Sequence, residues 1–198
     1  MIPLLCICGP SAAGKTTIVR ALQTTLSAQG VRALQLSCDD YYWPNWTPDP
    51  VYGYDTPAGI DTTTLLQELN QICRREADTL RRYDMVSHTT WREPLDQVYE
   101  LVVLEGAFGP QVLLNQPLLQ SLVYLELGLP VRLWRRLWRD LNERGHSLSF
   151  ALRQTVFETL PGERQFIDPL KQEADLIIEN SPNGLARLTR HAQSLLAR

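Results

Sequence analysis

Residues 9–16 read GPSAAGKT and match the pattern G-x-x-x-x-G-K-[ST] at every fixed position. The pattern follows an apolar run over residues 2–8 and precedes a helical pattern over residues 15–28. In that setting glycine lets the backbone turn so that several N–H groups point at phosphate oxygens, and the helix N-terminus adds its positive end. The chain is therefore constrained to fold around a strand, a phosphate loop and a helix, and we expect it to bind a nucleoside triphosphate.

Two side chains of this loop have a specific chemical task. Lys15 supplies a positive charge to the β- and γ-phosphates, and the Thr16 hydroxyl is a ligand for Mg²⁺. The residues expected to bind the nucleotide are Gly9, Ser11, Ala12, Ala13, Gly14, Lys15, Thr16 and Thr17.

Apolar and amphipathic segments alternate along the whole chain. Strands are expected over residues 2–8, 31–37, 101–104, 122–127 and 174–180, and helices over residues 15–28, 62–75, 131–144 and 183–197. Most strand candidates are continuous apolar runs, which is typical of parallel strands covered on both faces. The sequence thus predicts an α/β fold, with one domain over residues 1–198 and a five-stranded parallel sheet flanked by helices.

The composition narrows the class of protein. A chain of 198 residues that is 44% hydrophobic can bury one core. A net charge of −3 and a pI near 5.6 argue against a protein that binds nucleic acid or anionic membranes. The four cysteines include no C-x₂-C pair, and no apolar stretch approaches the roughly 18 residues of a membrane span. We therefore expect reduced thiols, a cytoplasmic location and no membrane partner.

Residues 39–60 interrupt the alternation with four prolines and six aromatic residues. Linkers rarely carry so much stacking surface, so we expect an ordered loop over a ligand. Asp39 and Asp40 open this segment directly after the second strand, and Glu105 lies at the end of the third. In a parallel sheet these carboxyl ends border the ligand crevice. Asp39 is the stronger candidate for accepting a proton from an attacking hydroxyl, whereas for Asp40 that role and a turn or capping role stay open.

Further motifs follow in a fixed order. They are LSCDDYY at 36–42, YDTPAGID at 54–61, RYDMVSH at 82–88, VVLEG at 102–106, RLWRRLWRDLNERG at 132–145 and FIDPLKQEADLIIEN at 166–180. In this order and spacing they resemble the uridine–cytidine kinase branch of the phosphoribulokinase/uridine kinase family over nearly the whole chain. The resemblance implies a P-loop kinase fold with a nucleoside-binding insert at about 39–60 and 77–98 and an arginine-rich lid at about 136–162.

The resemblance also implies individual roles. Asp39 would be the general base on a nucleoside 5′-hydroxyl, and Asp55 would hold the ribose hydroxyls. Mg²⁺ would be held by Thr16, Asp39 and Glu105. The residues around the nucleoside and the transferred phosphate would be Tyr42, Asp55, Tyr83, His88, Arg136, Arg139, Arg144 and Gln154, with Lys15, Arg136 and Arg139 joining Asp39 in catalysis. ATP is the implied donor, GTP stays open, the acceptor is a small-molecule nucleoside, and a homo-oligomer stays open because related kinases are often oligomeric.

Several positions depart from the family pattern. Thr56 replaces a histidine, Met85 stands where an aromatic residue packs against the base, and His146 replaces an arginine. Thr90 stands where the family has an arginine, for which Arg92 is a candidate substitute. SPNG at 181–184 replaces an adenine-side segment. These departures leave the preferred base and the donor nucleotide open.

The helix expected over residues 131–144 combines arginines with tryptophans. Leu133, Leu137 and Leu141 recur every four residues beside Trp134 and Trp138, so we expect an apolar stripe in which the tryptophans pack. The polar residues of the helix and its end would be the lid arginines Arg136, Arg139 and Arg144, the solvated Arg132 and Arg135, and the acids Asp140 and Glu143, available to pair with neighbours.

Alternatives to a uridine or cytidine kinase remain. The segment DDYYWP also resembles nicotinamide riboside kinases, and a pantothenate or sugar kinase belongs to the same superfamily. A P-loop ATPase or regulatory nucleotide-binding module gives Asp39, Asp55 and the arginines no task. A nucleic-acid-binding role for the arginine helix requires salt-sensitive binding to oligonucleotides and conflicts with the acidic net charge.

Overall fold

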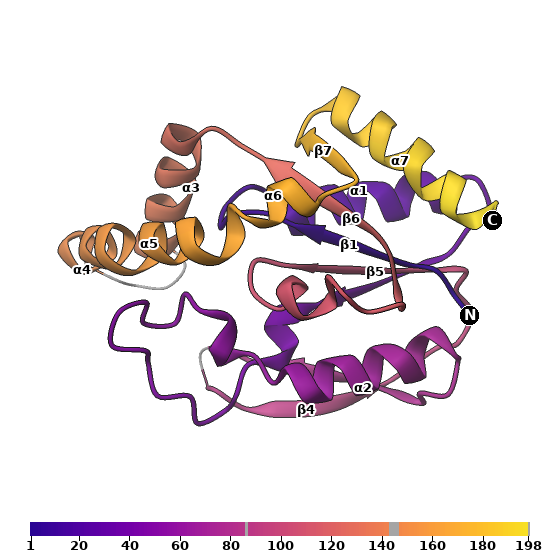
Figure 1. Ribbon diagram of the computed structural model, residues 1–198, viewed down its shortest axis with the longest axis horizontal. Helices are drawn as coiled ribbons and strands as arrows, with labels where there is room; N and C mark the ends of the chain where they lie inside the picture. The colour runs from indigo at the N-terminus through magenta and orange to yellow at the C-terminus, as the bar shows by residue number, and fades with distance from the viewer. Residues whose placement is uncertain (86, 143–146, 198) are drawn as a thin grey trace.

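The computed structural model describes residues 1–85, 87–142 and 147–197 (Figure 1). Its centre is a five-stranded parallel sheet in the order β2-β5-β1-β6-β7. The strands are β1 (Leu4–Cys8), β2 (Ala33–Ser37), β5 (Leu101–Gly106), β6 (Leu119–Glu126) and β7 (Leu176–Glu179). Helices cover both faces of this sheet, so the predicted fold class is confirmed.

The core consists of two apolar layers, one on each face of the sheet. α1 (Lys15–Ser27) and α7 (Pro182–Leu196) pack on the face that receives Leu5 and Ile7 of β1. α2 (Thr62–Cys73) packs on the opposite face, which receives Leu4 and Cys6. Because successive strand residues point to opposite faces, all of β1 is buried, as its continuous apolar run predicts.

Local sequence signals define the helix boundaries closely. The predicted N-cap Asp61 accepts a hydrogen bond from the backbone N–H of Thr64 (3.0 Å) and thereby starts α2. The helices expected over 15–28 and 183–197 are present within one or two residues of those bounds. No helix in the described part of the chain is long and apolar enough to cross a membrane.

The four cysteines are buried and unpaired, as expected. Burial raises the pKa of Cys8 and of Cys73 to about 12, so both thiols stay protonated at neutral pH. These residues therefore act as small apolar side chains of the core.

Between β2 and β5 the chain forms one feature that the sequence predicted and one that it did not. Residues 39–60 are structured as expected, with the 3₁₀ turns η1 (Cys38–Tyr41) and η2 (Pro57–Gly59) and a bridge between Tyr42 and Ile60. β3 (Thr79–Tyr83) and β4 (Thr90–Pro94) form an antiparallel hairpin that the sequence did not reveal. Their sequences TLRRY and TWREP lack the continuous apolar character of the central strands.

A nearly continuous helical segment covers residues 148–173. It consists of α4 (Leu148–Gln154), the π-helical turn η4 (Thr155–Thr159), α5 (Leu160–Gly162), the second π-helical turn η5 (Glu163–Ile167) and α6 (Leu170–Glu173). Pro161 lies between the two π-turns and has no N–H to donate, which interrupts the regular α-helical ladder. The sequence predicted a lid over part of this segment but not its helices.

The orientation of α3 (Leu129–Asn142) is opposite to the prediction. Its buried residues are Arg136 and Asp140, whereas Trp134 is 66% exposed and Trp138 is 51% exposed. The expectation that the tryptophans pack in an apolar stripe is therefore wrong. The polar face is turned inward because carboxylates of other segments meet it there.

The start of α7 requires a glycine, which gives a stability prediction. A Cβ at Gly184 would lie 1.9 Å from the backbone oxygen of Glu179, so Gly184→Ala forces α7 away from the end of β7. We expect a loss of about 2 kcal/mol in the free energy of unfolding, or a Tm lower by about 4–8 °C, measured by calorimetry.

Gly128→Ala is the matched control, because nothing lies within 4 Å of a Cβ at Gly128. Equal melting temperatures for the two variants would contradict the tight contact between α7 and β7.

Candidate active site

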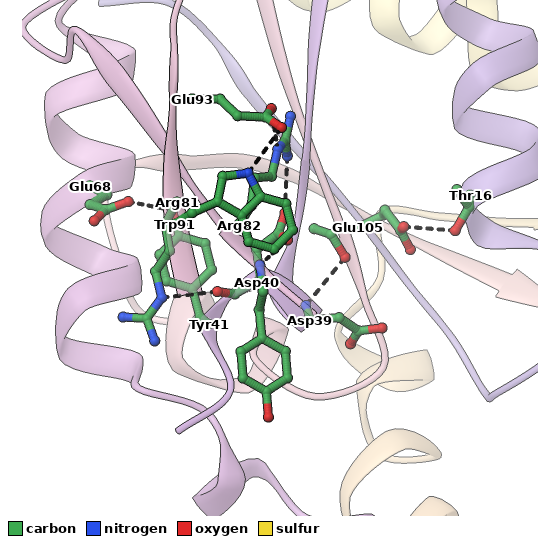
Figure 2. Close-up of polar contacts among 12 residues, drawn as sticks. Thr16, Asp39, Asp40, Tyr41, Glu68, Arg81, Arg82, Trp91, Glu93 and Glu105 are labelled. Carbon is green, nitrogen blue, oxygen red and sulfur yellow. Dashed lines mark hydrogen bonds and ion pairs between the residues drawn. The ribbon is translucent and has the colours of Figure 1, made fainter. Parts of the chain in front are cut away.

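Three strand ends meet at one edge of the sheet. β1 leads into the phosphate loop, β2 into η1 with Asp39, and β5 ends with Glu105 and Gly106. Because β5 lies between β2 and β1, Glu105 is in register with Ser37 on one side and with Ile7 on the other. The phosphate loop and the two predicted carboxylates are thus brought together by the strand order itself (Figure 2).

The phosphate loop depends on two glycines with positive φ. Gly9 has a φ of 141°, and a Cβ there would lie 2.4 Å from the backbone oxygen of Leu125. Gly14 has a φ of 94° and forms the N-cap of α1. The Lys15 ammonium donates to the backbone oxygens of Gly9 (3.0 Å) and Pro10 (3.1 Å), so it lies over the loop to which phosphates are expected to bind.

Thr16 and Glu105 form a hydrogen-bonded pair beside the loop. The Thr16 hydroxyl donates to Glu105 Oε1 at 2.8 Å (Figure 2). Burial raises the pKa of Glu105, Lys15 opposes this shift, and Asp39 adds to it. Among the described residues no group of three histidine, cysteine or acidic side chains is arranged to hold a metal. One hydroxyl with one or two carboxylates nevertheless fits Mg²⁺, which takes its remaining ligands from phosphates and water.

Asp39 and Asp40 differ sharply in their surroundings. Asp39 is exposed at the start of η1, where its N–H bonds to Ser37 Oγ (3.2 Å). Asp40 is partly buried and accepts hydrogen bonds from Arg82 (3.0 Å) and from the backbone N–H of Tyr83 (3.1 Å). Burial raises the pKa of Asp40, and the Arg82 contact opposes this shift. Asp40 therefore anchors β3 to η1, whereas the N-cap of η1 is Ser37.

Three of the predicted nucleoside-binding residues lie together. The Tyr83 hydroxyl is 2.7 Å from His88 Nδ1, and the Tyr42 and Tyr83 ring centroids are 6.1 Å apart. His88 has a φ of 55° in the turn between β3 and β4, an unusual conformation for a non-glycine residue. Arg81 holds η1 against the hairpin by donating to the backbone oxygens of Asp40 and Tyr42, each at 3.0 Å.

Arg92 does not join this group. It bonds to Glu68 of α2, a buried carboxylate that also accepts the Tyr41 hydroxyl (2.9 Å). Arg92 therefore fastens β4 to α2, and the expectation that it substitutes for an arginine near His88 is wrong.

Arg136 connects the phosphate loop to Asp55. Its guanidinium donates to Ser11 Oγ (3.2 Å), lies 3.6 Å from Asp55 Oδ2 and lies 3.5 Å from Asp140 Oδ2. The side chain of Arg136 is only 7% exposed, and that of Asp140 is fully buried. The predicted lid residue and the predicted ribose-binding residue are thus in contact, although they are 81 positions apart.

A second pair at the loop was missed from the sequence. Glu163 is buried and accepts a hydrogen bond from the backbone N–H of Ser11 (3.1 Å). It also forms an ion pair with Arg132 (2.7 Å). Arg132 is therefore not solvated, contrary to the expectation. A signal was present, because Arg132, Arg136 and Asp140 recur every four residues and so share one face of α3.

The remaining predicted residues are placed less centrally. Arg139 lies 3.5 Å from Asp140 Oδ1 and keeps 30% exposure. Gln154 ends α4, and its side-chain oxygen is buried without a hydrogen-bond donor among the described residues. Arg144, Glu143 and the departure at His146 lie outside the described residues.

Comparisons with known proteins find relatives over most of the chain. The family profile described as "Phosphoribulokinase / Uridine kinase family" matches residues 4–186 of the chain. A uridine kinase of Lactobacillus helveticus (strain DPC 4571) is 34% identical, with 96% of this chain and 93% of that protein covered.

Two solved structures share the fold. A provisionally named fructose transport system kinase from Silicibacter sp. TM1040 has a TM-score of 0.70 at 18% identity, covering 88% of both chains. A possible uridine kinase from Bacillus stearothermophilus has a TM-score of 0.62 at 20% identity, covering 88% of this chain and 87% of that one. At such low identity these two likenesses support the fold alone.

The buried Glu105 gives a prediction about pH. Its raised pKa means that the folded protein disfavours the charged form, so the destabilisation grows as pH rises above the ordinary glutamate value of 4.5. Without nucleotide and Mg²⁺, Glu105→Gln should raise the Tm at pH 8, because the amide carries no charge and still accepts the Thr16 hydroxyl. The gain should shrink as pH falls toward 4.5, where the wild-type carboxyl is protonated.

Melting curves between pH 5 and pH 8 measure this difference, and the exposed Glu173→Gln is the control for a general loss of negative charge. A Glu105→Gln variant no more stable than wild type at pH 8 would show that burial does not disfavour the Glu105 carboxylate.

Proposed function

The chain belongs to the phosphoribulokinase/uridine kinase family, and on that basis we propose that it transfers the γ-phosphate of ATP to the 5′-hydroxyl of a nucleoside, with uridine and cytidine as acceptors. The observation that carries this proposal is the contact of Arg136 with both Ser11 of the phosphate loop and Asp55 of the 39–60 segment. A P-loop ATPase that uses water as acceptor has no need of a second polar site bound to its phosphate loop.

The chemistry we propose uses Asp39 as general base. Asp39 takes the proton of the 5′-hydroxyl while the hydroxyl oxygen bonds to the γ-phosphorus and the bond from that phosphorus to the β–γ bridging oxygen breaks. ADP leaves with the bridging oxygen. The exposed position of Asp39 at the carboxyl end of β2 supports this role, because the acceptor hydroxyl needs access to it.

The cationic side chains neutralise the transferred group. Lys15 lies over the phosphate loop and Arg136 borders it, while Arg139 is the neighbouring lid arginine. Fixed cations in a partly buried site stabilise developing charge better than solvent does. Thr16, Glu105 and Asp39 are the residues we propose for Mg²⁺, which would neutralise phosphate oxygens.

The proposed binding of the nucleoside rests on one carboxylate and on a cluster of aromatic side chains. Asp55 accepts the ribose hydroxyls, and Tyr83 and His88 contact the base. Tyr42 lines the nucleoside pocket beside them. The hydrogen bond between Tyr83 and His88 supports a shared role, because it fixes the orientation of both rings. Gln154 contributes its buried side-chain oxygen near the ribose. The nucleoside-binding insert then consists of residues 39–60 and 77–98, and the lid consists of residues 136–162. The free cysteines support a cytoplasmic setting.

An ADP-release assay with Mg²⁺-ATP tests the proposal. Candidate acceptors are uridine, cytidine, adenosine, nicotinamide riboside, ribose and pantothenate. We expect ADP to form with uridine and cytidine and only slowly without an acceptor. Equal ADP release with and without nucleosides would contradict the nucleoside kinase and favour an ATPase.

Asp39→Asn is the variant that tests the proposed base in the same assay. Removal of a general base typically costs 10²–10⁴ in rate, so kcat for uridine should fall by roughly that factor with KM little changed. Undiminished turnover would remove Asp39 from the proposed role.

A further inference from the structure

Thr159 makes a contact that the proposed chemistry has not used. It lies at the end of the π-helical turn η4 and is only 2% exposed. Its hydroxyl donates to Asp55 Oδ2 at 2.7 Å, across a separation of 104 residues. A buried hydrogen bond to a carboxylate is among the stronger polar contacts in a protein.

The neighbouring Thr155 shows what a threonine in this helix otherwise does. Its hydroxyl donates to the backbone oxygen of Ala151 at 2.7 Å, four residues earlier, which is the usual bond of a helical threonine. The Thr159 hydroxyl lies 3.4 Å from the backbone oxygen of Gln154 in its own helix, so its bond to Asp55 is the shorter of the two. The π-turn therefore accompanies a hydroxyl that is directed out of its own helix, and such turns are frequent at functional sites.

Two glycines allow the chain around Asp55 and the helical segment around Thr159 to approach each other closely. A Cβ at Gly162 would lie 2.3 Å from the Asp55 backbone oxygen, and a Cβ at Gly53 would lie 2.1 Å from Glu158 Oε2. Gly53 lies two residues before Asp55, and its missing side chain leaves room for the side chain of Glu158. Residues 53–55 thus lie directly against the helical segment that carries Thr159.

The contacts of Asp55 have a consequence for its carboxylate. Among the described residues, Thr159 and Arg136 both approach the same oxygen, Oδ2. This arrangement fixes the rotation of the carboxylate and leaves Oδ1 to accept hydrogen bonds from a ligand. The Asp55 side chain keeps 13% exposure, so it is not sealed from the site.

We propose that Thr159 is a positioning residue for the acceptor: it orients the Asp55 carboxylate so that the enzyme selects acceptors with ribose 2′- and 3′-hydroxyls. The proposal rests on the nucleoside kinase function proposed above. A ribose with both hydroxyls binds more tightly to a carboxylate that is already ordered, because no free energy is then lost in ordering it on binding. An acceptor that lacks both hydroxyls gains nothing from it.

Thr159→Val tests the proposal, because valine keeps the shape of threonine and removes the donor. With saturating ATP, KM for uridine should rise about tenfold and kcat should change by less than about twofold, as expected for one lost hydrogen bond to a charged group. KM for 2′,3′-dideoxyuridine should stay unchanged, so the preference for uridine over the dideoxy compound falls about tenfold. Thr159→Ser should restore the preference.

Thr155→Val is the matched control. It is the same substitution in the same π-turn at a buried threonine, but the bond that it removes stays within the helix. We expect an unchanged ratio between uridine and dideoxyuridine. Thr159→Ala gives the same comparison if the valine variant does not fold.

The outcomes separate the two proposals. Wild-type enzyme that phosphorylates no nucleoside overturns the proposed function, and this inference falls with it. Wild-type enzyme that phosphorylates uridine, together with a Thr159→Val variant of unchanged preference, overturns only the role of Thr159. An equal rise in KM for uridine and dideoxyuridine also overturns it, because a merely structural defect would act on both.

Discussion

A guanidinium removed from water must be paired, and Arg136 meets that requirement with groups from separate parts of the chain. It contacts Ser11 in the phosphate loop, Asp55 in the 39–60 segment and Asp140 on its own helix. A buried ion without partners costs several kcal/mol, so these contacts form together. One side chain thereby joins the phosphate loop to the segment that we assign to the acceptor.

The same requirement explains why α3 presents its polar face inward. Arg132 adds a second link, through the buried Glu163 to the backbone N–H of Ser11. With Arg132, Arg136 and Asp140 directed at the site, Trp134 and Trp138 are left on the outer face. The helix is amphipathic as predicted, but electrostatic pairing rather than apolar burial decides which face is inside.

The sequence predicted the features that depend on local chemistry. The phosphate loop, the strands of the central sheet and the Asp61 cap each rest on a few neighbouring residues. The β3–β4 hairpin could not be found in this way, because contacts such as Arg82 with Asp40 and Arg92 with Glu68 stabilise it across the chain. Residue spacing shows which side chains share a helix face but not which face is inside, and the error on α3 follows from that. Of the candidate site, Tyr83 with His88 and Thr16 with Glu105 are found together, and the Glu163 and Thr159 contacts emerge only from the structure.

The central claim is that phosphate passes from ATP to a hydroxyl of a bound nucleoside rather than to water. Phosphorus-31 NMR of a reaction with ATP, Mg²⁺ and uridine observes both fates of the γ-phosphate at once. The account predicts uridine 5′-monophosphate and ADP in equal amounts, with no comparable rise in inorganic phosphate. ADP accompanied by an equal amount of inorganic phosphate, with uridine unchanged, would contradict it.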